Sequence, residues 1–303
     1  MATPQTSETT VSGFANLSDM DIVGWLPSTP PDARIHYSSA ALTYGDLRLP
    51  RGDDADGHPL VILIHGGAWE SSYTSDYVAR LAESLTALGV ATWNLEFRRL
   101  NNPGSDYPGM FLDISQGVDF ARELAKDYPI DLDRVVLLGH SSGGHLATWA
   151  AGRKNISPES PLYSEDPLRV SGVVDLAGVL DLEYAYNAGR TDVLQVVGAH
   201  DSAALREKAG DTSSIRLLPL GVPQSLIIGT ADNPWRLESH QRYRDAGMAG
   251  GDRIDLIRLE GANHFDVVDV SSPAWEPIVT AVREYAGLPK NGATDSIPAV
   301  SAN

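Results

Sequence analysis

The sequence predicts an α/β fold in which helices cover both faces of one mostly parallel sheet. Short apolar runs suited to buried strands alternate with helical patterns along most of the 303 residues, and we find no internal repeat and no long linker. Such alternation favours a parallel sheet, because each crossover returns the chain to the same edge. We therefore expect a single domain over residues 21–288.

The first half of that domain begins with residues Ala33–Leu49, whose alternating polarity suits one or two edge strands with a turn near residues 38–39. Leu60–Ile64 is a continuous apolar run, as in a strand buried on both faces. Tyr77–Leu88 carries apolar residues at helical spacing and stops at a glycine. Val90–Phe97 is the next predicted strand, and Leu112–Tyr128 is a predicted helix that ends before a proline.

The second half repeats this order. Arg134–Leu138 (RVVLL) is a predicted buried strand, and Ser142–Ala151 is the helix that follows it. Further strands are expected at Val170–Leu176, Gln224–Ile228 and Ile254–Leu259, and further helices at Arg236–Ala246 and Trp275–Tyr285.

Three segments do not follow the alternation. Residues 179–218 interrupt it, and we interpret them either as a lid inserted over one end of the sheet or as an ordinary surface excursion. Residues 1–20 are rich in Thr and Ser and are expected to form a flexible arm. Residues 289–303 are punctuated by Gly, Ala, Ser and Pro and are expected to be disordered.

Composition excludes several classes of function. The 40 acidic and 23 basic side chains give a net charge of −17, which disfavours nucleic acid and anionic membranes as partners. Cysteine is absent, which excludes a thiol nucleophile, thiolate metal ligands and disulfides. Neither a metal-ligand motif nor a dinucleotide-binding turn is present, so no metal and no cofactor are predicted. The first ten residues lack the features of a signal peptide, and no apolar run suits a membrane span; we expect a cytoplasmic protein.

The GHSSG motif at residues 139–143 matches the pattern G-x-S-x-G. The pentapeptide alone is weak evidence, but here it directly follows a predicted buried strand and directly begins a predicted helix. A serine at such a turn sits on a sharp bend, and the flanking glycines let strand and helix approach without a clash. This context predicts Ser141 as a nucleophile. A phosphate-binding glycine turn is the alternative, but the motif lacks the P-loop lysine.

The HGGAW motif at residues 65–69 follows the strand Leu60–Ile64. Glycines just past a strand end allow backbone N–H groups to face a ligand. We expect the N–H groups of Gly67 and Ala68, together with that of Ser142 after the nucleophile, to form an oxyanion hole.

Other residues of these two motifs have alternative roles. His65 is expected to hold its loop through hydrogen bonds rather than to act as a base. Trp69 either lines a substrate pocket or fills the core. His140 is expected to point sideways from the turn, and with Trp69 it is a candidate residue of the substrate pocket.

A serine nucleophile needs a general base and an acid that orients the base. Asp232 follows the predicted strand 224–228, and His264 follows the predicted strand 254–259. Both positions are carboxyl ends of strands, where parallel sheets place their sites. The sequence therefore predicts a triad of Ser141, His264 and Asp232.

Several other residues compete for these roles. Asp175 lies near the end of another strand and is the second choice for the acid. Asp266 is too close to the histidine in sequence to orient it easily. His145 is expected to pack on its helix, and His200 with Asp201 is expected to be a surface pair within the insertion.

These motifs, in the order Ser–Asp–His, resemble the α/β-hydrolase superfamily over residues 30–288. HGGAW is similar to the H-G-G-x-W motif of kynurenine formamidases (arylformamidases) and related carboxylesterases. GHSSGGHLA resembles their nucleophile segment, and NHFDVV resembles the stretch around their catalytic histidine. Hormone-sensitive-lipase-type esterases usually carry a third glycine where Ala68 stands, so the resemblance favours the formamidase side.

The resemblance implies a serine hydrolase that acts on a small-molecule ester or amide without a cofactor. Three substrate classes follow: a carboxylic ester, an aryl formamide, or a bulkier ester or lactone admitted by the lid. A non-catalytic small-molecule binder on the same fold is the alternative from a different class. A homodimer is compatible with the sequence.

Overall fold

The computed structural model describes residues 13–14, 18, 28–52 and 56–289. The expected arm over residues 1–20 and the expected tail over residues 289–303 lie almost entirely outside these described residues. No helix in the described part of the chain is long and apolar enough to cross a membrane.

One sheet organises the described chain, with the strand order β1-β2-β4-β3-β5-β6-β7-β8. Strands β1 and β2 form an antiparallel hairpin, β2 pairs antiparallel with β4, and all other neighbours are parallel. The strands are β1 Ala33–His36, β2 Tyr44–Arg48, β3 His58–Ile64, β4 Ala91–Glu96, β5 Ile130–His140, β6 Gly172–Leu176, β7 Gln224–Gly229 and β8 Ile254–Leu259.

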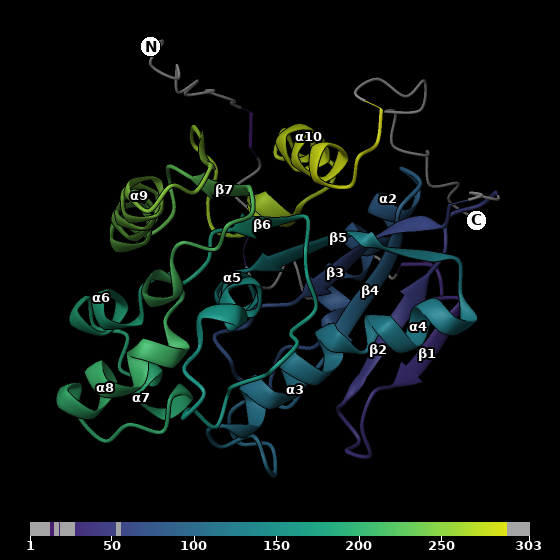
Figure 1. The fold of residues 1–303 in the computed structure, drawn as a ribbon. Helices are drawn as coiled ribbons and strands as arrows, with labels where there is room; N and C mark the ends of the chain where they lie inside the picture. Colours follow the sequence, from purple (N-terminus) through teal and green to yellow (C-terminus); the bar gives the residue numbers. More distant parts are fainter. Residues whose placement is uncertain (1–12, 15–17, 19–27, 53–55, 290–303) are drawn as a thin grey trace.

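Helices lie on both faces of this sheet, as the alternation predicts (Figure 1). The α-helices are α2 Ala79–Thr86, α3 Gly109–Asp119, α4 Ala121–Asp127, α5 Ser142–Gly152, α6 Leu182–Asn187, α7 Asp192–Val196, α8 Ser202–Thr212, α9 Pro234–Ala249 and α10 Trp275–Tyr285. The 3-10 helices are η1 Ser75–Val78, η2 Arg153–Asn155, η3 Ser214–Leu217 and η4 Asp266–Val268.

Two hydrophobic layers sandwich the sheet, and β3 shows why. Its side chains alternate, so Leu60, Ile62 and Ile64 join the layer under α3, α4 and α5, while Val61 and Leu63 join the layer under α2 and α10. Figure 1 shows these two groups of helices on opposite sides of the sheet. All five side chains are at most 1% exposed, which explains the continuous apolar run in the sequence.

Several elements differ from their predicted bounds, and two of these differences have a clear structural cause. The helix expected over residues 112–128 is two helices that meet at Phe120, whose carbonyl oxygen accepts from the N–H groups of both Glu123 and Leu124. Strand β5 begins at Ile130 rather than at residue 134. Its first residues pair with His58 and Pro59 of β3 before a register shift, a long-range contact that the polar sequence does not reveal.

The insertion at residues 179–218 contains α6, α7, α8 and η3. Its apolar side chains Leu182, Val193 and Leu205 are at most 1% exposed and belong to the same hydrophobic layer as α5. The insertion is therefore an integral part of the domain, and its movement as a lid stays a prediction. It also sends Arg190, between α6 and α7, to the cavity described below.

Candidate active site

Ser141 stands at the sharp turn between β5 and α5. Its backbone has φ 56° and ψ −119°, a strained conformation for a residue with a side chain. The glycines around it are required by close packing. A Cβ atom on Gly139 would lie 2.1 Å from the carbonyl oxygen of Gly143, and one on Gly143 would lie 2.0 Å from the carbonyl oxygen of Ile64. This crowding of strand against helix is the geometry expected from the GHSSG motif.

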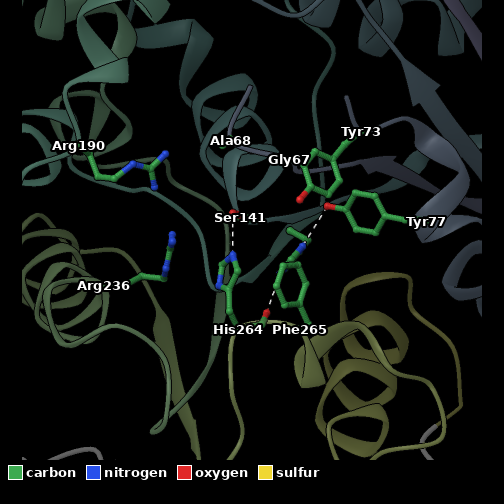
Figure 2. Close-up of a pocket in the computed structure, with 10 residues that line it drawn as sticks. Gly67, Ala68, Tyr73, Tyr77, Ser141, Arg190, Arg236, His264 and Phe265 are labelled. Atoms are coloured by element: carbon green, nitrogen blue, oxygen red, sulfur yellow. Dashed lines mark hydrogen bonds between the residues drawn. The ribbon is translucent and has the colours of Figure 1, made fainter. Parts of the chain in front are cut away.

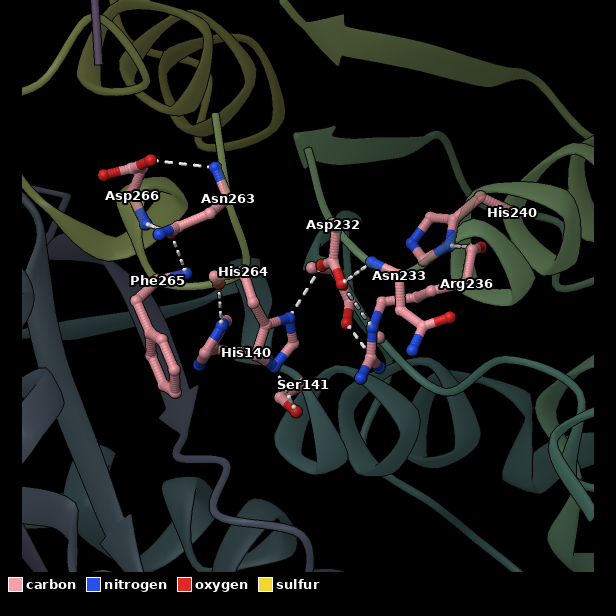
Figure 3. Close-up of polar contacts among 12 residues, drawn as sticks. His140, Ser141, Asp232, Asn233, Arg236, His240, Asn263, His264, Phe265 and Asp266 are labelled. Atoms are coloured by element: carbon pink, nitrogen blue, oxygen red, sulfur yellow. Dashed lines mark hydrogen bonds and ion pairs between the residues drawn. The ribbon is translucent and has the colours of Figure 1, made fainter. Parts of the chain in front are cut away.

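Three side chains from separate strand ends form a continuous hydrogen-bonded series (Figure 3). The Ser141 hydroxyl lies 2.9 Å from Nε2 of His264, and Nδ1 of the same ring donates to Asp232 Oδ2 over 2.7 Å. Ser141 follows β5, Asp232 follows β7 and His264 follows β8. With Nδ1 carrying its hydrogen toward the carboxylate, Nε2 is free to accept the serine proton.

The charges around this series keep the acid ionised and the base neutral. Burial opposes ionisation of Asp232, but the hydrogen bond from His264 and the positive charge of Arg236 outweigh it, and the pKa of the carboxyl falls well below its ordinary value. Burial and then the charge of Arg236 lower the pKa of His264 below 6.5, although Asp232 opposes them. At neutral pH the imidazole is therefore an unprotonated base.

The loop after β3 presents backbone N–H groups beside Ser141. Gly67, Ala68 and Trp69 all have positive φ, at 109°, 54° and 59°. Within the described chain, the N–H groups of Gly67 and Ala68 donate to no internal acceptor. Ser142 is the first residue of α5, where a backbone N–H has no partner within the helix. These N–H groups are thus available to a ligand, which is what an oxyanion site requires of its donors.

A buried polar network supports this loop from behind. The His65 ring is fully buried and contacts the carboxylate of Glu96 and Nη1 of Arg99, at 3.4 and 3.0 Å. Burial opposes ionisation of Glu96, but the hydrogen bond with His65 and the charges of His65 and Arg99 lower its pKa to about 2. Gly66 N–H donates to the Tyr77 hydroxyl in the same region. His65 thus holds the loop rather than facing the cavity.

A cavity of about 230 Å³ opens over Ser141. Figure 2 shows two arginines on one side of the serine and aromatic side chains on the other. The lining residues are Gly67, Ala68, Tyr73, Tyr77, His140, Ser141, Arg190, Arg236, His264 and Phe265.

The two candidate pocket residues, His140 and Trp69, lie in different places. His140 lines the cavity, and its Nε2 donates to the carbonyl oxygen of His264 over 2.9 Å. Trp69 does not line the cavity, which corrects the expectation that it belongs to the substrate pocket. Its side chain is 1% exposed, and its indole N–H donates to Nδ1 of His145 over 3.3 Å. Its ring packs edge-on against the ring of His145, with the two centroids 5.6 Å apart.

The structure separates the competing acids and bases from Ser141. Asp175 accepts from His240 over 2.8 Å, and Asp266 accepts from the backbone N–H of Asn263 over 2.8 Å. The exposed His200 lies 3.4 Å from Asp201, away from the cavity.

Sequence reasoning missed five residues of the cavity: Tyr73, Tyr77, Arg190, Arg236 and Phe265. Phe265 is adjacent to the predicted base, which is the one signal that was available. The arginines come from the insertion and from α9, and nothing in their local sequence shows that they converge. No group of His, Asp and Glu suited to hold a metal ion occurs among the described residues.

Comparison with known proteins identifies a family that matches this chain. A family model described as BD-FAE matches residues 46–233. Isoprenylcysteine alpha-carbonyl methylesterase ICME of Arabidopsis thaliana is 26% identical over 237 residues, which are 73% of this chain and 53% of that protein. Esterase LipQ of Mycobacterium tuberculosis is 28% identical over 250 residues, which are 78% of this chain and 58% of that protein. The chain therefore spans little more than half the length of these curated relatives.

Solved structures agree on the fold. A truncated form of a carbohydrate esterase from gut microbiota superposes with a TM-score of 0.74 at 20% identity, covering 86% of this chain and 99% of that one. This likeness confirms the predicted α/β-hydrolase fold. The family model covers more than half of the sequence, and the chain thus belongs to the BD-FAE family, an esterase family of the α/β-hydrolase fold.

Proposed function

We propose that the protein is a serine hydrolase that cleaves a carboxylic ester through a covalent acyl-enzyme. One observation carries this proposal: the hydrogen-bonded series from Ser141 through His264 to Asp232, at 2.9 and 2.7 Å, on the floor of an open cavity. A protein that only binds a small molecule has no need of a neutral, oriented base beside a strained serine.

In the acylation step, Ser141 Oγ attacks the carbonyl carbon of the ester while its proton passes to His264 Nε2. The N–H groups of Gly67, Ala68 and Ser142 stabilise the negative charge that forms on the carbonyl oxygen. The tetrahedral intermediate then collapses: the bond to the alcohol oxygen breaks, and His264 returns its proton to that leaving oxygen. The alcohol departs and the acyl group stays on Ser141.

Deacylation repeats these steps with water. His264 takes a proton from water as its oxygen attacks the acyl carbon, and the same donors stabilise the second oxyanion. Collapse of this intermediate breaks the bond to Ser141 Oγ, which recovers the proton from His264, and the carboxylic acid leaves. Asp232 stays ionised throughout and stabilises the imidazolium, as its lowered pKa requires.

Among the substrate classes, the comparisons support an ester. Two of the relatives are named as a methylesterase and an esterase. An aryl formamide and a bulkier ester or lactone need the same acyl chemistry, and a single panel of substrates ranks the three.

The experiment labels the serine and measures turnover in the same samples. A fluorophosphonate probe should label the wild type and should not label Ser141→Ala. Ser142→Ala is the matched control, since it removes the neighbouring hydroxyl but keeps its backbone N–H, and it should still be labelled. The turnover panel contains 4-nitrophenyl esters, N-formylkynurenine and lactones. A folded wild type that neither reacts with the probe nor turns over any substrate would overturn the proposal.

A further inference from the structure

Two guanidinium groups face the cavity although the protein as a whole carries a net charge of −17. Arg190 comes from the segment between α6 and α7, and Arg236 comes from the first turn of α9. Figure 2 shows both side chains reaching toward the space above Ser141 from the same side. The residues that line the cavity include these two cations and no carboxylate.

Each arginine is held in place by part of its guanidinium and keeps a donor free. Arg236 donates from Nε to Asp232 Oδ1 over 3.3 Å and from Nη1 to the carbonyl oxygen of Ala177 over 3.1 Å. Arg190 donates from Nε and Nη2 to the carboxylate of Asp192, over 3.0 and 2.5 Å. Within the described chain, Nη2 of Arg236 and Nη1 of Arg190 have no hydrogen-bond acceptor.

An indole ring fixes the two side chains close to one another. The guanidinium carbon of Arg236 lies 4.6 Å from the centre of the Trp235 ring, and that of Arg190 lies 6.0 Å from the same ring. Arg190 also stacks over Trp69 at 5.7 Å. Stacked guanidinium groups lose little conformational freedom on binding a ligand, so the pair is preorganised.

The two guanidinium groups repel one another, and burial of Arg236, which is 5% exposed, strengthens that repulsion. Burial lowers the pKa of Arg236, and although Asp232 opposes this effect, the charge of Arg190 lowers that pKa further. The hydrogen bond to Asp232 accounts for the position of Arg236 beside the series of Ser141, His264 and Asp232. It does not explain Arg190, which the insertion brings to the cavity together with its own carboxylate partner.

The opposite side of the cavity has a different chemistry. Tyr73, Tyr77 and Phe265 line it, and Figure 2 shows them across Ser141 from the arginines. Rings suit an aromatic or apolar group, whereas guanidinium forks suit a carboxylate. The scissile carbonyl at Ser141 would lie between the two.

We propose that the substrate is an ester with a carboxylate on one side of the scissile bond and an aromatic or apolar group on the other, and that the free N–H groups of Arg190 and Arg236 bind this carboxylate. This inference rests on the proposed esterase function and names its substrate class.

The test compares esters that differ only in charge. One pair is mono(4-nitrophenyl) adipate and its methyl ester, with the carboxylate on the acyl side. The second pair is benzoyloxyacetate and its N-methylamide, with the carboxylate on the alcohol side. For each pair we take the ratio of kcat/KM for the anion to kcat/KM for the neutral analogue, since this ratio cancels any general loss of activity.

The wild type should favour the anion in at least one pair, and Arg190→Gln should lower that ratio about tenfold or more, since a charged hydrogen bond is lost. Arg190→Lys keeps the charge without the fork and should recover part of the ratio. Arg206→Gln is the matched control. It removes the same charge from an exposed position on α8, where its partner Glu183 is 3.6 Å away, and it should keep the wild-type ratio.

The outcomes separate this inference from the proposed function. Hydrolysis of the neutral esters with no preference for the anion in either pair, or a preference that survives Arg190→Gln, would overturn the carboxylate site and leave the esterase standing. Absence of hydrolysis of all four compounds, with no labelling of Ser141 by the fluorophosphonate, would overturn both.

Discussion

The structure contains two buried aspartate–histidine pairs near the carboxyl ends of the strands, and one of them contacts Ser141. Asp232 and His264 approach to 2.7 Å, and Asp175 and His240 approach to 2.8 Å. The His264 side chain is 22% exposed and borders the cavity, whereas the His240 side chain is 0% exposed. Figure 3 shows the first pair beside Ser141 and His240 on α9 beyond Arg236.

The difference lies in the second ring nitrogen. Nε2 of His264 meets the hydroxyl of Ser141, while Nδ1 of His240 meets the backbone carbonyl oxygen of Arg236 at 2.8 Å. Both ring nitrogens of His240 are therefore engaged by groups of the protein itself, and the ring does not border the cavity. An Asp–His pair can thus act as a base only where the second ring nitrogen faces a group that can give up a proton. The pair of Asp175 and His240 instead links elements of the fold. It contacts Arg236, which in turn contacts Asp232.

The largest expected effect separates the two histidines. His264→Ala should lower kcat by about 10⁴-fold or more, because the nucleophile loses its base. His240→Ala should keep kcat within about tenfold in the fraction that folds. Steady-state hydrolysis of a 4-nitrophenyl ester measures both. The double variant Ser141→Ala with His264→Ala should be no slower than either single variant. A His240→Ala enzyme as inactive as His264→Ala would remove the distinction.

Substitution of the two aspartates should also have different effects, on activity for Asp232 and on stability for Asp175. Asp232→Asn should lower kcat by about 10⁴-fold, since the amide can donate to Nδ1 and select the wrong tautomer of His264. Asp175→Asn should instead lower the free energy of unfolding by about 2 kcal/mol, because an amide replaces the buried carboxylate that accepts from His240 and from the Gly178 N–H. Urea denaturation and ester hydrolysis, run on both variants, check the two effects. Equal losses of stability with equal activities would contradict this assignment.

The pH dependence tests Arg236, whose guanidinium group contacts Asp232 and whose backbone carbonyl oxygen contacts His240. Because burial and Arg236 lower the pKa of His264, its neutral form persists as the pH falls below 6.5, and the acid limb of kcat/KM should lie below pH 6.5. Arg236→Gln removes a positive charge beside the imidazole, so the pKa should rise and the limb should move to higher pH. Arg242→Gln, at an exposed position of the same helix, is the control. A limb that stays in place would show that Arg236 does not act on His264.

The smallest effect concerns a third histidine, which contacts the first pair from its other side. His140 Nε2 donates to the carbonyl oxygen of His264, and the Tyr77 hydroxyl lies 3.0 Å from His140 Nδ1. Tyr77→Phe removes that contact and the acceptor of Gly66 N–H. We expect a loss of up to about tenfold in kcat and about 1 kcal/mol in stability. Thermal unfolding and hydrolysis measure the two losses, and an increase in kcat would contradict the supporting role.

Elements with a strong local pattern were predictable from the sequence. The predicted strand Ile254–Leu259 and the predicted helix Trp275–Tyr285 have the bounds of β8 and α10. An apolar run or a helical repeat is a local property, because burial of one or both faces of an element requires apolar residues at a fixed spacing in its own sequence. The start of β5 and the break at Phe120 depend on pairing and turns across the fold, so local pattern could not reveal them.

The chain order of the site also came from local signals. The glycines around Ser141 are a steric necessity of the turn, and the positions of Asp232 and His264 after strands follow from topology, because parallel strands end at one edge. The sequence by itself thus determined the fold class, the turn and the candidate triad.

Only the tertiary structure decided which side chains share the cavity. In the structure, Trp69 packs in the core and Asp175 is hydrogen-bonded to His240. Arg190, from the insertion, lines the same cavity as Arg236 and Ser141. Such meetings join residues far apart in the chain, and they depend on the directions in which side chains leave their elements. Those directions are set by packing over the whole domain, and no local stretch of sequence contains them.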